Sequence, residues 1–121
     1  MVTASEADQK LVQRAQRGDL RAFDLLVLKY QGRISALVSR YISDPSEVED
    51  VTQEAFIKAY RALERFRGDS AFYTWLYRIA ANAAKNYLVA KGRRPRSAAS
   101  IEDAEAFDEF GVSSDSGSPE A

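Results

Sequence analysis

One stretch of the chain carries the side chains best suited to act on another molecule. Within residues 66–94, an aromatic ring, an amide and two cations follow one line at helical spacings of three and four: Trp75, Arg78, Asn82 and Lys85. Rings stack on bases, cations meet phosphates and an amide can read a base edge, so this line could bind nucleic acid. An amphipathic helix with a tryptophan at the core margin and a solvated basic flank fits the same pattern, which leaves both readings open.

The composition excludes several kinds of site. The 121 residues contain no cysteine and no histidine, so the sequence offers no disulfide framework and lacks the usual zinc ligands and general base. No apolar run is long enough to span a bilayer, and the first ten residues lack the pattern of a signal peptide. We therefore expect a cytoplasmic, single-domain protein that is not an enzyme and needs no cofactor, metal or small-molecule ligand.

Charge is divided unevenly along the chain, although the net charge is only −1. Residues 58–96 hold ten basic residues against two acids, whereas residues 44–54 hold five acids and no base. Residues 97–121 hold seven acids, no base and many small residues, which is typical of a disordered acidic tail. The segregation suggests separate surfaces for a polyanion and for a protein partner, although a solvated helix face can produce it too.

Four helices must position these side chains. Apolar periodicity predicts them over about residues 5–17, 20–42, 46–63 and 70–90. The first helix is expected to start at Ser5, with Asp8 three residues later, and to stop at Gly18. The second is expected to stop at Asp44-Pro45, and the third to start with a capping box of Ser46 and Glu49. The fourth is expected to be capped by Asp69 or Ser70 and to stop at Gly92. The sequence thus predicts an all-α fold, a compact bundle of four helices over residues 1–96 followed by a disordered acidic tail over residues 97–121.

The third predicted helix has two contrasting faces. Its inward face is apolar and comprises Val48, Val51, Ala55, Phe56, Ala59 and Leu63. Its outward face comprises Asp50, Gln53, Glu54, Ile57 and Arg61. An apolar Ile57 among acids and an amide indicates a docking surface, and a merely solvated face is the alternative.

Two motifs closely resemble the first conserved domain of bacterial extracytoplasmic-function (ECF) sigma factors, nearest to the sigma-E/AlgU group. They are DVTQEAFIKAYRAL (50–63) and FRGDSAFYTWLYRIAANAAKNYLVAKGRR (66–94), and the similarity extends over about residues 8–96, including LVQRAQRGDLRAFDLLVLKY (11–30). The resemblance implies a sigma-2 helical domain that docks on the clamp helices of RNA polymerase and captures unpaired non-template bases of the promoter −10 element. It also implies an envelope-stress role under an anti-sigma factor.

The resemblance carries roles to individual residues. The polymerase-binding positions are Asp50, Gln53, Glu54 and Ile57. The pocket for one flipped-out base is formed by Ala62, Phe66, Ile79 and Asn82. The candidates for phosphate contacts are Lys58, Arg61, Arg67, Arg78, Lys85, Arg93 and Arg94. Tyr73 and Trp75 are the candidates for stacking or for holding the melted junction.

The sequence departs from that family after Ser97, where nothing resembles the second domain that reads the −35 element. The resemblance therefore implies an isolated domain with the start of its linker. Two other classes of function remain: a protein-only adaptor whose basic face is merely solvated, and an enzyme that uses the carboxylates Asp50 and Glu54. Salt-dependent DNA binding would argue against the adaptor, and turnover of any substrate would revive the enzyme.

Overall fold

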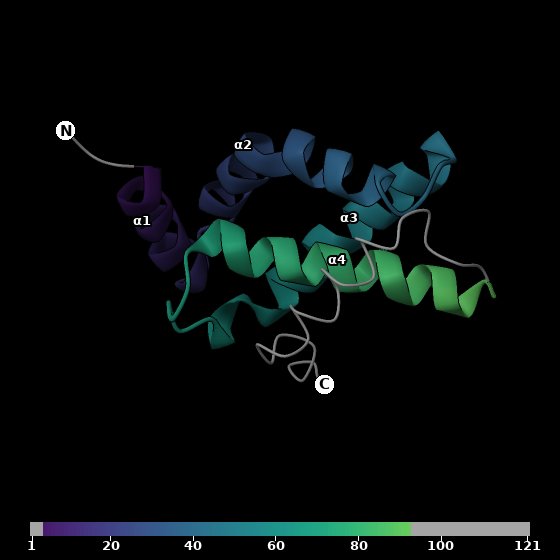
Figure 1. Cartoon of the computed structure of the whole chain (residues 1–121). Helices are drawn as coiled ribbons and strands as arrows, with labels where there is room; N and C mark the ends of the chain where they lie inside the picture. Colours follow the sequence, from purple (N-terminus) through teal and green to yellow (C-terminus); the bar gives the residue numbers. More distant parts are fainter. Residues whose placement is uncertain (1–3, 93–121) are drawn as a thin grey trace.

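The computed structural model describes residues 4–92 and shows a helical fold in that range (Figure 1). The elements are α1 (Ala4–Gln16), α2 (Leu20–Ser39), α3 (Pro45–Ala62), the short 3-10 helix η1 (Leu63–Arg65) and α4 (Phe72–Ala90). The predicted all-α bundle of four long helices is confirmed. The expected acidic tail, residues 97–121, lies outside the described residues.

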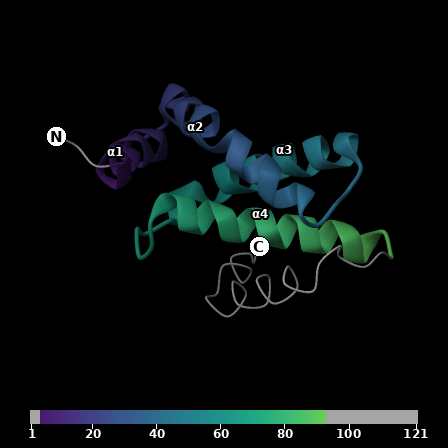
Figure 2. The ribbon, with the colours of Figure 1, turned by 45° about the horizontal axis from the view of Figure 1, so that its top comes forward.

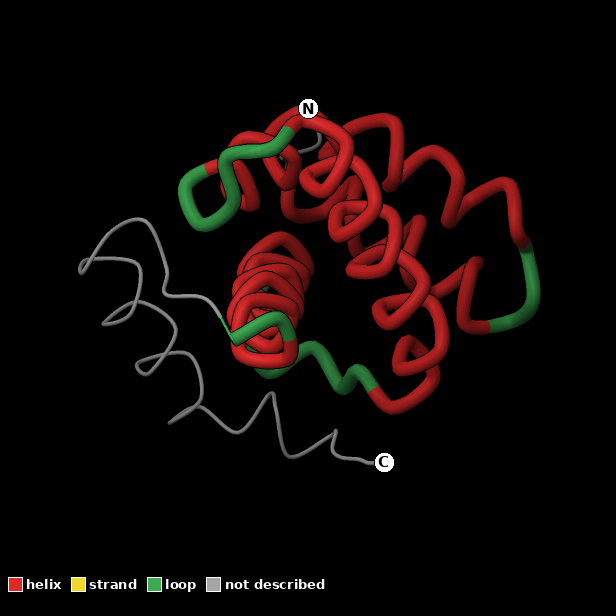
Figure 3. The backbone as a smooth tube through the Cα atoms, turned by 90° about the vertical axis from the view of Figure 1, so that its right-hand side faces the viewer, coloured by secondary structure: helices red, strands yellow, loops and turns green. Residues whose placement is uncertain are grey.

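The helix α4 is packed against α2 and α3 along most of its length (Figures 1 and 2). Figure 3 looks nearly along α4 and shows the other helices gathered on one side of it, with α1 packed against α2. Small side chains occupy the contact between α3 and α4, where Ala55, Ala59, Ala80 and Ala84 are fully buried. Alanines at these positions let the helix backbones approach closely, and Leu26, Ile34 and Val38 of α2 complete the core.

Three predicted helix starts are wrong. Ser5, the predicted cap of the first helix, lies inside α1. Asp44, not Ser46, caps α3: its carboxylate accepts the backbone N–H of Glu47 at 3.0 Å and the Ser46 hydroxyl at 2.8 Å. Pro45 has no N–H to donate and suits the first helical position, so the cap falls one residue before it. The helix α4 begins after Ala71, an N-cap residue whose methyl side chain cannot accept a hydrogen bond, and Asp69 and Ser70 precede the cap position. The Asp69 carboxylate pairs with Arg67 at 3.3 Å.

The ends of the first two helices also differ in part from expectation. The stop at Gly18 is as predicted, and its φ of 100° is a conformation that glycine adopts without strain. The helix α2 ends at Ser39, three residues before the predicted end at Ile42. Tyr41 and Ile42 are nevertheless buried in the core. Their side chains continue the apolar pattern because they pack in the core, although their backbone is no longer helical. No helix within residues 4–92 is both long and apolar enough to cross a bilayer.

A buried carboxylate joins α1 to α2, where the sequence suggested a capping residue. Asp8 is 4% exposed and accepts hydrogen bonds from the Tyr30 hydroxyl and, at 2.7 Å, from Lys29 Nζ. Burial and the neighbouring Asp8 carboxylate raise the pKa of the Tyr30 phenol well above its ordinary value. The phenol therefore stays protonated and remains a donor to Asp8 across the physiological range.

The hydrogen bond between Asp8 and Tyr30 predicts a measurable coupling between the two residues. Asp8→Ala should lower the free energy of unfolding by about 2–3 kcal/mol, because it leaves the buried Tyr30 hydroxyl without an acceptor. Tyr30→Phe should cost about 1 kcal/mol, and the double variant should cost less than the sum. Urea denaturation measures all three, with Asp24→Ala, an exposed carboxylate on α2, as the control expected within about 0.5 kcal/mol of the parent. Additive losses would contradict the assignment.

Candidate nucleic-acid interface

The predicted line of residues on α4 is not an open surface. Trp75 and Asn82 are only 6% and 8% exposed, whereas Arg78 and Lys85 are half-buried. The Trp75 ring lies 4.8 Å from the Phe66 ring, centroid to centroid, in the segment that follows η1. Trp75 and Asn82 are therefore enclosed rather than open to solvent, and Phe66, in the segment before α4, covers part of Trp75. For the tryptophan, the core-margin alternative is correct.

Asn82 is a polar side chain enclosed in an apolar setting. Its amide nitrogen is buried and makes no hydrogen bond with any residue that the structure describes. Leaving a buried donor unpaired costs about 1–3 kcal/mol, so natural proteins rarely keep such a group without a use for it. Trp75, Ile79 and Asn82 follow one another at spacings of four and three, which places them on one stripe of α4. This stripe offers one amide donor among apolar walls.

The other two predicted pocket residues come from the end of α3 and the loop after it. The helices α3 and α4 run antiparallel (Figures 1 and 2), and residues 50–58 of α3 line a groove together with residues 83–87 of α4. Ala62 at the end of α3 is thereby placed beside the first half of α4, and both Ala62 and Phe66 are partly buried against the core. Phe66 packs against Phe72 and Trp75 at the start of α4, and Ile79 and Asn82 follow one and two turns beyond Trp75 on the same helix.

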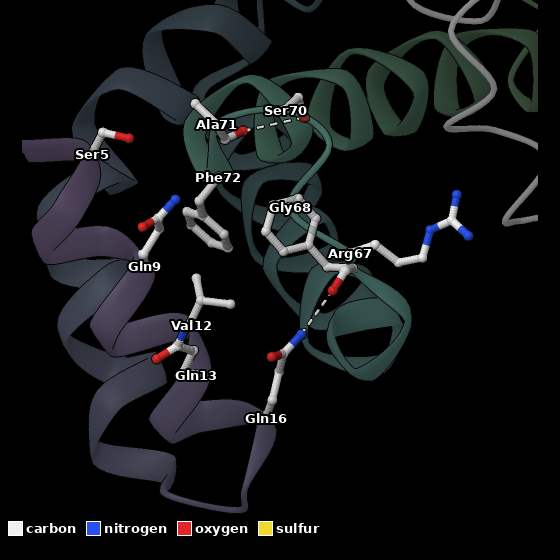
Figure 4. Close-up of a pocket in the computed structure, with 11 residues that line it drawn as sticks. Ser5, Gln9, Val12, Gln13, Gln16, Arg67, Gly68, Ser70, Ala71 and Phe72 are labelled. Atoms are coloured by element: carbon white, nitrogen blue, oxygen red, sulfur yellow. Dashed lines mark hydrogen bonds between the residues drawn. The ribbon is translucent and has the colours of Figure 1, made fainter.

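The loop between η1 and α4 is held on its other side by α1. The Gln16 amide donates to the carbonyls of Leu63 and Phe66, both at 2.9 Å. A cavity of about 250 Å³ separates α1 from the loop, and in Figure 4 Gln9 and Val12 of α1 face the Phe72 ring across it. The two hydrogen bonds from Gln16 fix the backbone at Leu63 and at Phe66.

The loop also presents a cation to solvent. Gly68 has a φ of 81°, which allows the tight turn between Arg67 and Asp69. The Arg67 and Asp69 side chains are 81% and 79% exposed, and Figure 4 shows the Arg67 side chain extending away from the cavity. An exposed ion pair of this kind contributes little to stability, so Arg67 remains available to an anionic partner.

The remaining predicted cations lie around these residues. Lys58 and Arg61 are exposed on α3, whereas Arg93 and Arg94 lie outside the described residues. Tyr73 is half-buried and stacks on Tyr30 with ring centroids 4.9 Å apart. The sequence analysis missed three residues here: Arg33 and Tyr77 adjoin Tyr73, and Arg40 adjoins Tyr77. The absence of acids from residues 25–43 is the signal that could have indicated the two arginines.

The outward face of α3 is as polar and exposed as predicted. Asp50, Gln53 and Glu54 are exposed, and Ile57 is 44% exposed. A groove of about 370 Å³ lies between this face and α4, lined by Asp50, Val51, Glu54, Lys58, Ala83, Asn86 and Tyr87. Residues 4–92 hold no cluster of three or more acids, cysteines or histidines that could bind a metal ion. The face therefore offers charge and one apolar side chain to a partner.

Comparison with known proteins identifies relatives of the whole described region. The family model described as Sigma-70 region 2 matches residues 26–94. The chain is 65% identical over 116 residues to the RNA polymerase sigma-H factor of Pseudomonas aeruginosa, covering 95% of this chain and 60% of that protein. It is 60% identical over 114 residues to the ECF RNA polymerase sigma-E factor of Escherichia coli K12, covering 93% of this chain and 59% of that protein. The chain thus spans about three fifths of these relatives.

A solved structure is similar over most of the described residues. It is the NMR structure of an engineered region 2 of sigmaE in complex with GTAAAA, with 61% identity and a TM-score of 0.67. The alignment covers 70% of this chain and 88% of that one. At this identity the similarity extends from the fold to most of the side chains that the fold positions.

The two hydrogen bonds of Gln16 predict a specific loss on its removal. Gln16→Ala should lower the free energy of unfolding by about 1–2 kcal/mol, since two loop carbonyls lose their donor, and should speed amide hydrogen exchange in residues 66–71. Gln13→Ala is the matched control, because Gln13 lines the same cavity from the same helix without either hydrogen bond. Equal effects of the two substitutions would show that the bonds do not hold the loop.

Proposed function

Since this chain belongs to the Sigma-70 region 2 family, we propose that it serves transcription initiation by capturing an unpaired base of the promoter −10 element while bound to RNA polymerase. This would place its action in the cytoplasm. Family membership supports the general role, and the similar region 2 structure bound to GTAAAA supports single-stranded DNA as the ligand. The observation that carries the proposal in this chain is the buried, unpaired amide nitrogen of Asn82.

The proposed base pocket comprises Ala62, Phe66, Ile79 and Asn82. An amide can donate to and accept from the edge of a base, and this edge is free only when the base is unpaired. The pocket has apolar walls. The Phe66 ring packs against the Trp75 ring, and the hydrogen bond from Gln16 to the Phe66 carbonyl holds its backbone. A base that enters would give Asn82 the hydrogen bond that it lacks within residues 4–92. That gain, with stacking worth about 1–3 kcal/mol per base, offsets the cost of unpairing.

The cations around the pocket supply binding that does not depend on sequence. Lys58, Arg61 and Arg67 are exposed, so their charges can reach phosphates, and counterion release favours the contact. Arg78 and Lys85 run along α4 beside Asn82, and Arg93 and Arg94 extend the basic sequence beyond it. None of these steps makes or breaks a covalent bond, so the phosphodiester chemistry belongs to the polymerase.

We propose that polymerase binds the acidic stripe, defined as Asp50, Gln53, Glu54 and Ile57. The stripe is exposed, faces away from the core and places an apolar side chain among carboxylates, a composition that suits a basic partner surface with an apolar contact. An anti-sigma factor that covers the same stripe would exclude polymerase. Such competition would make this domain inactive until the inhibitor is removed, as an envelope-stress response requires.

The base pocket is tested by removing the amide. Asn82→Ala should cost about 1–3 kcal/mol for the preferred base and flatten discrimination at that one position of a single-stranded −10 oligonucleotide. Arg61→Ala should weaken binding to oligonucleotides of every sequence by the same factor and should reduce the salt dependence of the affinity. Fluorescence anisotropy with each base permuted measures both, and Asn86→Ala, an exposed amide one turn further along α4, is the matched control.

Thermal melting separates recognition from folding. Because the Asn82 amide nitrogen has no partner within residues 4–92, Asn82→Ala should retain the melting temperature of the parent. A large fall in melting temperature with unchanged base preference would mean that the amide serves the fold. Binding that is insensitive to salt would favour the protein-only adaptor.

The acidic stripe is tested by charge reversal. Glu54→Lys should weaken binding to core polymerase at least tenfold, because it places a cation against the proposed basic surface, and should leave helicity unchanged. Glu64→Lys, an exposed glutamate on η1 outside the stripe, is the control. Pull-down with purified core polymerase measures the effect. Equal polymerase binding by the two variants would show that the acidic stripe is not the polymerase surface. If Glu54→Lys but not Glu64→Lys also abolishes binding to an anti-sigma factor, the two partners compete for one surface.

A further inference from the structure

The short helix η1 has two of the four proposed pocket residues at its ends. Ala62 is the last residue of α3 and directly precedes η1, and Phe66 is the residue that follows it. Leu63, the first residue of η1, is buried, so the core holds this segment from one side. The conformation of η1 therefore sets how Ala62 and Phe66 are placed relative to Ile79 and Asn82 on α4.

One side-chain amide of α1 closes the turn that η1 makes. The Phe66 N–H donates to the Leu63 carbonyl at 3.0 Å, which is the backbone hydrogen bond of the turn. Gln16 Nε2 donates to that same carbonyl and to the carbonyl of Phe66, both at 2.9 Å. An amide nitrogen carries two hydrogens, so it can serve both carbonyls at once. Gln16 thus joins the first residue of η1 to the residue that follows its end.

The loop after η1 has little else to hold it on the side of α1. Within residues 4–92, the hydrogen bonds of residues 67–71 are made inside the loop or to Trp75 at the start of α4. The cavity of about 250 Å³ lies on the α1 side of the loop, and α1 faces the Phe72 ring across it (Figure 4). Packing on that side therefore leaves the loop room to shift, and the hydrogen bonds from Gln16 oppose the shift.

The support to which Gln16 ties the loop is firm. Gln16 is the last residue of α1, and the turn after it is closed by a hydrogen bond from the Asp19 N–H to the Arg14 carbonyl at 3.0 Å. The Arg14 side chain donates to the Asp19 carboxylate at 2.7 Å, and the same carboxylate accepts the Arg21 N–H and so caps α2. These bonds fix the end of α1 relative to α2, so the position of the loop is set from the core of the bundle.

We infer that Gln16 is a positioning residue for base capture: its bonds to the carbonyls of Leu63 and Phe66 keep the loop in the form that encloses a base beside Asn82. The inference rests on the proposed function and adds a residue of α1 that acts through the loop rather than by contact with the base.

This role gives Gln16 an effect on selectivity. A base that enters the pocket binds only those molecules in which the loop is in place, so its apparent affinity falls with the population of that form. A base that the pocket rejects is held through the phosphates of its strand, and its affinity does not depend on the loop. Loss of Gln16 therefore weakens binding of the preferred base alone.

The test replaces the amide by a side chain of similar length that has no donor. Gln16→Met should weaken binding of the −10 oligonucleotide with the preferred base about fivefold, the population change expected for one hydrogen bond of ordinary strength. Oligonucleotides with another base at that position should bind within about twofold of the parent, with the same salt dependence. Gln16→Lys restores a donor and should recover most of the preference. Fluorescence anisotropy with the whole 121-residue chain measures each affinity.

Two control variants separate positioning from stability. Gln13→Met makes the same replacement on α1 beside the same cavity, where no loop carbonyl is bonded, and should keep the base preference. Tyr30→Phe removes a buried hydrogen bond between α1 and α2, so it should lower the melting temperature and also keep the preference.

A measurement without DNA checks the loop directly. Trp75 is the single tryptophan of the chain, and its ring lies 4.8 Å from the Phe66 ring. Displacement of Phe66 uncovers this tryptophan, so quenching of its fluorescence by acrylamide should increase in Gln16→Met and stay at the parent level in Gln13→Met.

The outcomes distinguish this inference from the function on which it rests. If Gln16→Met lowers the melting temperature but keeps the base preference, while Asn82→Ala loses it, Gln16 serves only the fold and the inference is wrong although the base pocket stands. If Gln16→Met and Tyr30→Phe reduce the preference equally, the effect follows from stability and the inference is again wrong. If the parent shows no base preference, the proposed function fails and this inference fails with it.

Discussion

The structure depends on the enclosure of α4. Ten of its nineteen residues are buried, which is more than the single apolar stripe of a surface helix requires. Alanines contribute to this, because Ala80, Ala81 and Ala84 are fully buried and their small side chains allow close approach by the neighbouring helices. A helix enclosed in this way holds its remaining polar side chains in fixed positions, and those side chains lie at the margins where one neighbour ends and the next begins.

The two margins of α4 differ in chemistry. On one side, the segment after η1 returns over Trp75, and the stripe that continues from Trp75 contains an amide donor without a partner in the described residues. On the other side, α2 contributes arginines beside the tyrosines of α4. The first margin is enclosed and suited to reading one group, whereas the second is open and suited to charge and stacking. The two flanks of α4 therefore differ in enclosure and in charge.

The acidic stripe and the basic face are separated by the packing of α3 against α4. Asp50 and Glu54 line one wall of the groove between these helices, and Lys58 continues the same wall toward the pocket end. Acids are thus gathered at the first half of α3, while Lys58 and Arg61 follow near its end, so like charges are grouped rather than mixed.

The sequence by itself determined the four helices, the turn at Gly18 and the exposed stripe of α3, because these follow from periodicity and local conformational preference. It also determined the family, because the motifs of residues 50–94 are long and specific. Only the tertiary structure decided that Asp8 is a buried partner of Tyr30, that Trp75 and Asn82 are enclosed, and that Arg33 stacks on Tyr73. A helical pattern gives the direction of a side chain, but the neighbour that it meets is set by how distant segments pack.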